Sequence, residues 1–285
     1  MFRNLTELVS GSESLLHTTF RKLPVATPAA GTWFDLSMAA GYPIPNYYAS
    51  NPLESRYMSY SRQKGVFHGH GNYNDKRLFE SMVMGTNIQW INTPMIMLDY
   101  LMYYPFINEG DSEVQFMDNV ESLPRYVDGK GVQMMAVSLG SRSGGQTFQI
   151  TYTNQDGVAG RVTPPIMGNN TSTVNGSLMN TSGTLTIQGS APFLPLQGGD
   201  TGVRSVQSVR MVSGVDTGIF ALVLVRPLAV TGFYDASTVS YKNHVTDSGL
   251  VPPKIENDAY VNFLVMSNGS FSGQTLSGYL NFIAK

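Results

Sequence analysis

The carboxyl-terminal half of the chain alternates between short apolar segments and clusters of turn-forming residues. From about residue 131, seven segments have the length of a β-strand, and runs of Gly, Ser, Asn and Asp separate them. In one of them the alternation is strict, because Phe148, Ile150 and Tyr152 all fall on the same face. This pattern predicts a mainly β chain that folds as an antiparallel β-sandwich or jelly roll. The seven segments are residues 133–139, 147–153, 184–188, 203–212, 219–225, 260–266 and 276–283.

One of these segments has no polar face. Residues 219–225 have the sequence IFALVLV and are apolar at every position. A strand that is buried on one side alternates between polar and apolar residues, whereas a strand covered on both sides is apolar throughout. Residues 219–225 are therefore predicted to form a central strand with both faces covered.

Composition narrows the classes of function. Charged residues make up 13% of the 285 residues, about half of the ~25% in an average soluble domain, and the formal net charge is -2. This near balance argues against a role in coating nucleic acid, which requires many phosphates to be neutralised. The chain has no cysteine, which excludes disulfides, thiolate metal sites and cysteine nucleophiles. A lightly charged surface fits burial against protein partners, and the alternative is a monomer with a neutral, hydroxyl-rich surface.

The first 60 residues are predicted to be an extended docking segment. Leu5 and Leu8 have helical spacing, and residues 15–23 suit either a short helix or a strand. Residues 32–60 combine many aromatic residues with prolines that forbid a continuous helix. Aromatic side chains on irregular backbone pack either in a core or at an interface, and both interpretations stay open here.

Residues 61–130 are predicted to be a mixed segment with one or two short helices. Apolar residues within 76–85 fall on one face of a helix, and residues 95–104 (MIMLDYLMYY) are apolar nearly all round. A strand is the alternative for the second stretch, because its tyrosines favour sheets. Asp99 lies in this apolar stretch and is the strongest candidate for a perturbed pKa. The third predicted segment is the β-sandwich over residues 131–285, and the alternative is one continuous domain over 61–285.

Two clusters of polar residues have the composition of a metal site. His68 and His70 are two residues apart, which on an extended chain places them on opposite faces, so ordinary hydrogen bonds in a glycine-rich loop are the favoured interpretation. A hydrolase that uses these histidines with Asp75 is the alternative. The acidic stretch from Glu109 to Glu113 does not match a calcium loop and is interpreted as a solvated turn.

Other motifs of catalysis and targeting are missing from the sequence. It contains no nucleophile elbow, no phosphate-binding loop and no dinucleotide-binding fingerprint. We therefore assign no catalytic, cofactor-binding or metal-binding residue and expect a protein that is not an enzyme. No apolar run approaches the ~18 residues of a membrane span, and the amino terminus lacks the features of a secretory signal. We expect a soluble protein made in the cytoplasm, with neither a membrane nor a nucleic acid as a partner.

Several phrases of the sequence resemble a family of tailed-bacteriophage virion structural proteins. The likeness covers roughly residues 32–165 and does not extend beyond them. It implies a component of a virus particle and not a catalyst. The phrases are WFDLSM (33–38), GYPIPNYYASNPL (41–53), DYLMYYPF (99–106), LPRY (123–126), DGKGVQMM (128–135) and TYTNQDG (151–157).

The resemblance suggests a capsid decoration (cement) protein that clamps neighbouring shell subunits. Its partners would then be the major capsid protein and further copies of this chain, as a dimer or trimer. The docking residues predicted for this role are Trp33, Phe34, Tyr42, Tyr47 and Tyr48. The alternatives are a tail, neck or head-fibre component, or an outer module that binds a glycan or receptor through residues 164–200.

Overall fold

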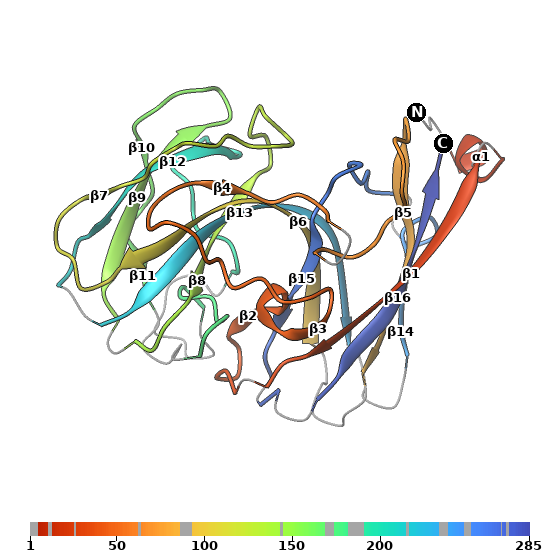
Figure 1. Ribbon diagram of the computed structural model, residues 1–285, viewed down its shortest axis with the longest axis horizontal. Helices are drawn as coiled ribbons and strands as arrows, with labels where there is room; N and C mark the ends of the chain where they lie inside the picture. Colours follow the sequence, from red (N-terminus) through yellow and green to blue (C-terminus); the bar gives the residue numbers. More distant parts are fainter. Residues whose placement is uncertain are drawn as a thin grey trace.

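Antiparallel β-sheets make up most of the protein (Figure 1). The computed structural model describes residues 5–10, 13–25, 27–61, 64–85, 93–142, 145–168, 174–181, 191–214, 217–233, 239–247, 252–268, 270–271 and 274–285. Across these residues the strands form three sheets, and every pair of neighbouring strands is antiparallel. The prediction of a mainly β, antiparallel sandwich is confirmed.

The central sheet has the strand order β2-β15-β6-β13-β8, and the short strand β4 also pairs with β6. The strands are β2 (Trp33–Asp35), β4 (Arg56–Tyr57), β6 (Thr93–Asn108), β8 (Gln133–Ser138), β13 (Ile219–Phe233) and β15 (Val261–Met266).

One outer sheet lies at the left of Figure 1 and has the order β10-β9-β12-β7, with β11 also on β9. The other lies at the right and has the order β14-β5-β16-β1-β3. The left-hand strands are β7 (Gln115–Phe116), β9 (Thr147–Asn154), β10 (Arg161–Val162), β11 (Ile166–Met167) and β12 (Val203–Met211). The right-hand strands are β1 (Ser14–Leu23), β3 (Ala40–Tyr42), β5 (Lys76–Gly85), β14 (Ser240–Asn243) and β16 (Leu276–Ala284).

The two long strands β6 and β13 connect two sandwiches that lie side by side. They pair along their full length, from Ile219 opposite Asn108 to Phe233 opposite Thr93. On one face of β6, Met95 and Met97 pack against the right-hand sheet, and Leu101 and Tyr104 pack against the left-hand sheet. One face of the central sheet therefore supplies a wall to both hydrophobic cores.

The opposite face of the central sheet is also covered. Tyr100 and Val223 are among its inward side chains, and Trp33, Tyr48 and Met58 from the first 60 residues pack over that face. This explains why β13 is apolar throughout residues 220–225, all of which are fully buried. The prediction of a central strand at 219–225 is confirmed.

The helices predicted over residues 76–104 are wrong, and the strand kept as the alternative for residues 95–104 is confirmed. Residues 76–85 form β5 and residues 93–108 form β6. Periodicity alone does not separate a buried helix from a strand covered on both faces, and β6 is such a strand. The short helices lie elsewhere in the described chain, at α1 (Leu5–Ser10) and at the 3-10 turn η1 (Leu36–Met38).

Pro105 lies within β6, whereas a helix would have ended before this proline. Pro105 and Phe106 together lie opposite the single residue Ala221, so they form a β-bulge, and Phe106 has a φ of 59°. A bulge leaves a residue without its ladder hydrogen bond, which suits proline because proline has no amide hydrogen.

The first 60 residues contribute strands to the sheets of this same chain and do not form a separate arm. β1 pairs with β16 from Ser14 to Lys22, and β2 pairs with β15. The physical reason is the alternation in β1, which places Phe20 in the right-hand core. Strand pairing thus crosses both expected segment boundaries, at residues 60 and 130. The predicted strand at 184–188 and part of the loop at 164–200 lie outside the described residues.

Candidate functional site

Asp99 is buried between the two hydrophobic cores and binds Arg125. The guanidinium donates from Nε to Oδ2 at 2.8 Å and from Nη2 to Oδ1 at 2.7 Å, and the Tyr260 amide donates to Oδ1 at 2.9 Å. Burial raises the pKa of Asp99 above its ordinary value, and the neighbouring Arg125 opposes that rise. Asp99 is fully buried, as its apolar neighbours in the sequence predicted. Its contacts are those of a structural ion pair.

A second buried carboxylate, Asp35, is the last residue of β2 and belongs to the predicted docking segment. It accepts hydrogen bonds from the Tyr100 hydroxyl at 2.6 Å, from the Ser37 amide and hydroxyl at 2.8 and 2.9 Å, and from the Tyr48 hydroxyl. Burial lowers the pKa of Lys22 to about 8, an effect that the negative charge of Asp35 opposes. The Lys22 ammonium donates to two backbone carbonyls, so this cluster is also satisfied from within the fold.

The histidine loop makes internal contacts. His68 is buried, with Nε2 2.8 Å from the Ala259 carbonyl oxygen and Nδ1 3.1 Å from the Lys76 ammonium. His70 is exposed and packs on the Phe67 ring, and Asp75 pairs with Arg77. Among the described residues, no three His, Asp or Glu side chains come together as a metal site.

The acidic stretch after β6 differs from the predicted solvated turn at one residue. Glu109 is fully buried, and Arg142 donates to its carboxylate from Nε at 2.8 Å and from Nη2 at 2.6 Å. Glu113 is exposed, as expected. Arg142 lies 33 residues away in sequence, so no local pattern indicated this ion pair.

Three of the five predicted docking residues are inside the protein. Trp33, Phe34 and Tyr48 are 7%, 3% and 0% exposed, so they pack in the core, which was the other interpretation of this aromatic segment. Tyr42 is half-buried, and its hydroxyl accepts a hydrogen bond from the Phe67 amide. Tyr47 is 60% exposed and remains available for docking.

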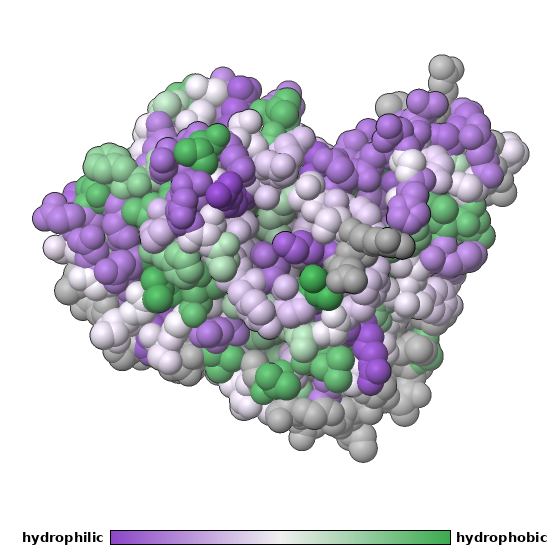
Figure 2. All heavy atoms as spheres, viewed as in Figure 1, coloured by the Kyte–Doolittle hydropathy of each residue, from purple (hydrophilic) through white to green (hydrophobic). Residues whose placement is uncertain are grey.

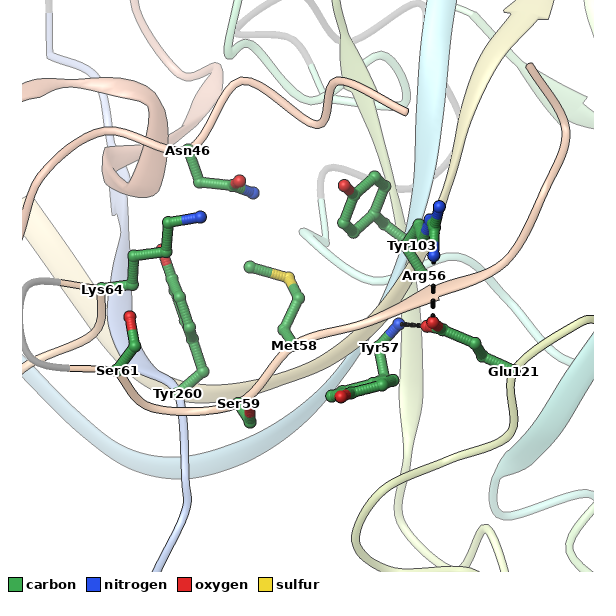
Figure 3. A pocket seen from close by; sticks show the side chains of 10 residues that line it. All are labelled: Asn46, Arg56, Tyr57, Met58, Ser59, Ser61, Lys64, Tyr103, Glu121 and Tyr260. Carbon is green, nitrogen blue, oxygen red and sulfur yellow. Dashed lines mark hydrogen bonds and ion pairs between the residues drawn. The ribbon is translucent and has the colours of Figure 1, made fainter. Parts of the chain in front are cut away.

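A polar pocket of about 330 Å³ lies on the surface formed by residues 46–61 (Figure 3). At one end Arg56 on β4 forms an ion pair with Glu121 at 3.2 Å, and the Tyr57 amide donates to the same carboxylate. The Tyr57 side chain is 52% exposed. The lining residues are Asn46, Arg56, Tyr57, Met58, Ser59, Ser61, Lys64, Tyr103, Glu121 and Tyr260.

Sequence reasoning missed this pocket. Arg56 and Glu121 are 65 residues apart, and they meet because Ser55 hydrogen-bonds to Asp118 and Glu121 of the segment after β7. Tyr57 belongs to the aromatic segment, and this was the one available signal in the sequence. We call residues 46–61 together with the pocket they line the docking surface.

Comparisons with known proteins identify no family. No protein-family model matches the chain, and no curated protein sequence matches it. Among solved structures, the D431N mutant VP2 protein of infectious bursal disease virus, in T=1 particles, aligns with 96% of this chain and 78% of its own. The identity is 10% and the TM-score is 0.21, which is too low to establish a shared fold. Within the described residues, no helix is long and apolar enough to cross a membrane.

Proposed function

We propose that this chain is a non-enzymatic structural component of a tailed-phage virion, most specifically a capsid decoration (cement) protein. The observation that carries the proposal is how the side chains are distributed between interior and surface. The buried carboxylates Asp35, Asp99 and Glu109 are all occupied by partners within the fold. Large aromatic and aliphatic side chains, in contrast, remain on the surface.

The exposed side chains include the aromatic residues that interfaces favour. Tyr47 and Tyr57 on the docking surface are 60% and 52% exposed, and Phe116 on the edge strand β7 is 73% exposed. Tyrosine contributes strongly to binding because it buries a large rigid ring and keeps a polar end. We infer that the docking surface contacts the major capsid protein, and that other faces contact further copies of this chain.

Two paired sandwiches suit a clamp. The central sheet is continuous through both halves, and its long strands β6 and β13 are hydrogen-bonded along their length (Figure 1). A body of this kind transmits load between two contacts without a flexible linker, which is what a protein that holds neighbouring shell subunits requires. The resemblance of residues 32–165 to virion structural proteins supports the same role.

The test is binding of the purified protein to capsids that lack it. The double variant Tyr47→Ala, Tyr57→Ala is expected to bind at least about tenfold more weakly, because each ring is expected to contribute more than about 1 kcal/mol as an interface anchor. The matched control is Val158→Ala, Val230→Ala, which shortens two side chains that are similarly exposed elsewhere. Unchanged binding by the tyrosine variant would show that the docking surface is not the contact with the shell.

A further inference from the structure

One end of the docking-surface pocket holds polar groups that have no acceptor within the part of the chain that the structure describes. Figure 3 shows the amide of Asn46, the ammonium of Lys64 and the hydroxyl end of Tyr260 at the same end of the pocket. Tyr260 is 2% exposed. Its hydroxyl oxygen and the Asn46 Nδ2 are both buried and have no hydrogen-bond partner among the described residues.

These groups are donors in need of an acceptor. An unsatisfied buried polar group destabilises the fold, and buried polar groups in native proteins nearly always have a partner. Burial raises the pKa of Tyr260 well above its ordinary value, so the hydroxyl keeps its proton and can donate it. Lys64 adds a positive charge beside these two donors. At the other end of the pocket, Glu121 is already paired with Arg56.

We propose that this end of the pocket binds the carboxylate of an aspartate or glutamate side chain from a partner protein. The inference rests on the proposed function, since it names the chemistry that the docking surface recognises. A carboxylate supplies two acceptor oxygens for the Asn46 and Tyr260 donors. Its negative charge also pairs with the positive charge of Lys64.

Two further observations favour a protein side chain as the occupant. The volume of about 330 Å³ is at the small end of the range for ligand sites, which suits one side chain. The exposed ring of Tyr57 also lies at the pocket, and an aromatic ring beside a charged pocket is typical of a protein interface.

The test uses acetate as the probe and the Met58 methyl group as the reporter, because Met58 lines the pocket. The protein is labelled with methyl-¹³C methionine, and Met58→Leu assigns the signal. Titration with sodium acetate at constant ionic strength is expected to shift this signal to saturation, and titration with neutral acetamide is not. Lys64→Gln and Tyr260→Phe are each expected to weaken acetate binding at least tenfold. The matched control is Lys254→Gln, which changes a lysine outside the pocket that pairs with Glu256.

Tyr260→Phe also separates a binding role from a structural one. The hydroxyl has no partner in the described structure, so its removal is expected to leave the melting temperature unchanged or higher while acetate binding is lost. A lowered melting temperature with unchanged acetate binding would overturn the proposal.

Other outcomes also contradict the inference. If acetate does not shift the Met58 signal, the pocket is not a carboxylate site. The same conclusion follows if acetamide or chloride shifts the signal equally. Tighter binding of N-acetylneuraminic acid than of N-acetylglutamate would assign the pocket to an acidic sugar. It would overturn the proposal that a protein side chain occupies the pocket. The titration uses the free protein, so it stands even if the protein proves to be absent from the capsid shell.

Discussion

At the scale of single residues, the hydrogen bonds to Asp35 hold residues 35–48 against the central sheet. Asp35 is fully buried at the end of β2, and its carboxylate accepts hydrogen bonds from Ser37, Tyr48 and Tyr100. A buried carboxylate without such donors costs several kcal/mol. The sequence predicted that Asp99 would be buried, because its neighbours are apolar. It did not predict the partners of Asp35, because Tyr100 is 65 residues away and arrives on another strand.

Removal of one donor tests this role of Asp35. Tyr48→Phe keeps the ring and removes only the hydroxyl, so it leaves a buried carboxylate short of one hydrogen bond. We expect the free energy of unfolding to fall by roughly 1.5–3 kcal/mol, the range for hydrogen bonds to charged groups. Urea denaturation measures this change. Tyr47→Phe is the matched control on the adjacent exposed tyrosine, and equal effects of the two substitutions would contradict a structural role for the Tyr48 hydroxyl.

The buried histidine predicts how stability depends on pH. Burial, aided by the charge of Lys76, lowers the pKa of His68 to about 4, whereas its ordinary pKa is 6.5. Below pH 6.5 the unfolded chain binds a proton that the folded protein does not, so stability is highest above pH 6.5 and is lost as pH falls toward 4. Between pH 6.5 and 5 the expected loss is roughly 1.5 kcal/mol, because the slope approaches about 1.4 kcal/mol per pH unit only when most of the unfolded histidine is protonated.

Unfolding measured across this pH range tests the assignment to His68. His68→Gln is expected to flatten the dependence, although not to abolish it, because burial also lowers the pKa of His244. The control His70→Gln changes an exposed histidine in the same loop and is expected to keep the wild-type slope. If the free energy of unfolding of His68→Gln depends on pH as steeply as that of the wild type, a group other than His68 causes the loss of stability.

At the scale of elements, strands with a clear period could be predicted and the pairing between them could not. The alternation in residues 147–153 and the apolar run at 219–225 locate β9 and β13 to within a few residues at their amino-terminal ends. β6 fitted a helix as well as a strand, because a strand covered on both faces loses the period of two. β5 was mistaken for a helix, because its apolar residues also fit one face of a helix. The continuation of β13 to Phe233 was also missed, because Pro227 lies at a register shift that the sequence does not reveal.

Strand pairing predicts that the carboxyl-terminal segment does not fold alone. A fragment of residues 131–285 keeps β8, β9, β12, β13, β15 and β16 but lacks β6, which lies between β13 and β15 in the central sheet. Without β6, both strands expose buried edges and the two cores lose a shared wall. We expect this fragment to be unfolded or aggregated, with no dispersed amide signals in its NMR spectrum. A dispersed spectrum would show that the boundary at residue 130 separates independent domains.

At the scale of the whole molecule, one continuous sheet joins two sandwiches into a single body with several distinct faces. The surface in Figure 2 mixes hydrophilic and hydrophobic residues across the face in view. The sequence predicted the sandwich class but not the shared sheet, because that sheet is formed by contacts between distant segments. Of the predicted docking residues, Trp33, Phe34 and Tyr48 are buried, and docking through the exposed Tyr47 stays a prediction.

Cryo-electron microscopy of the purified particle tests the proposed function most directly. The proposal predicts density for this chain in hundreds of copies on the icosahedral shell, with Tyr47 and Tyr57 of the docking surface against neighbouring shell subunits. A dozen or fewer copies at the tail or neck, or no density for this chain in the particle, would contradict the decoration role.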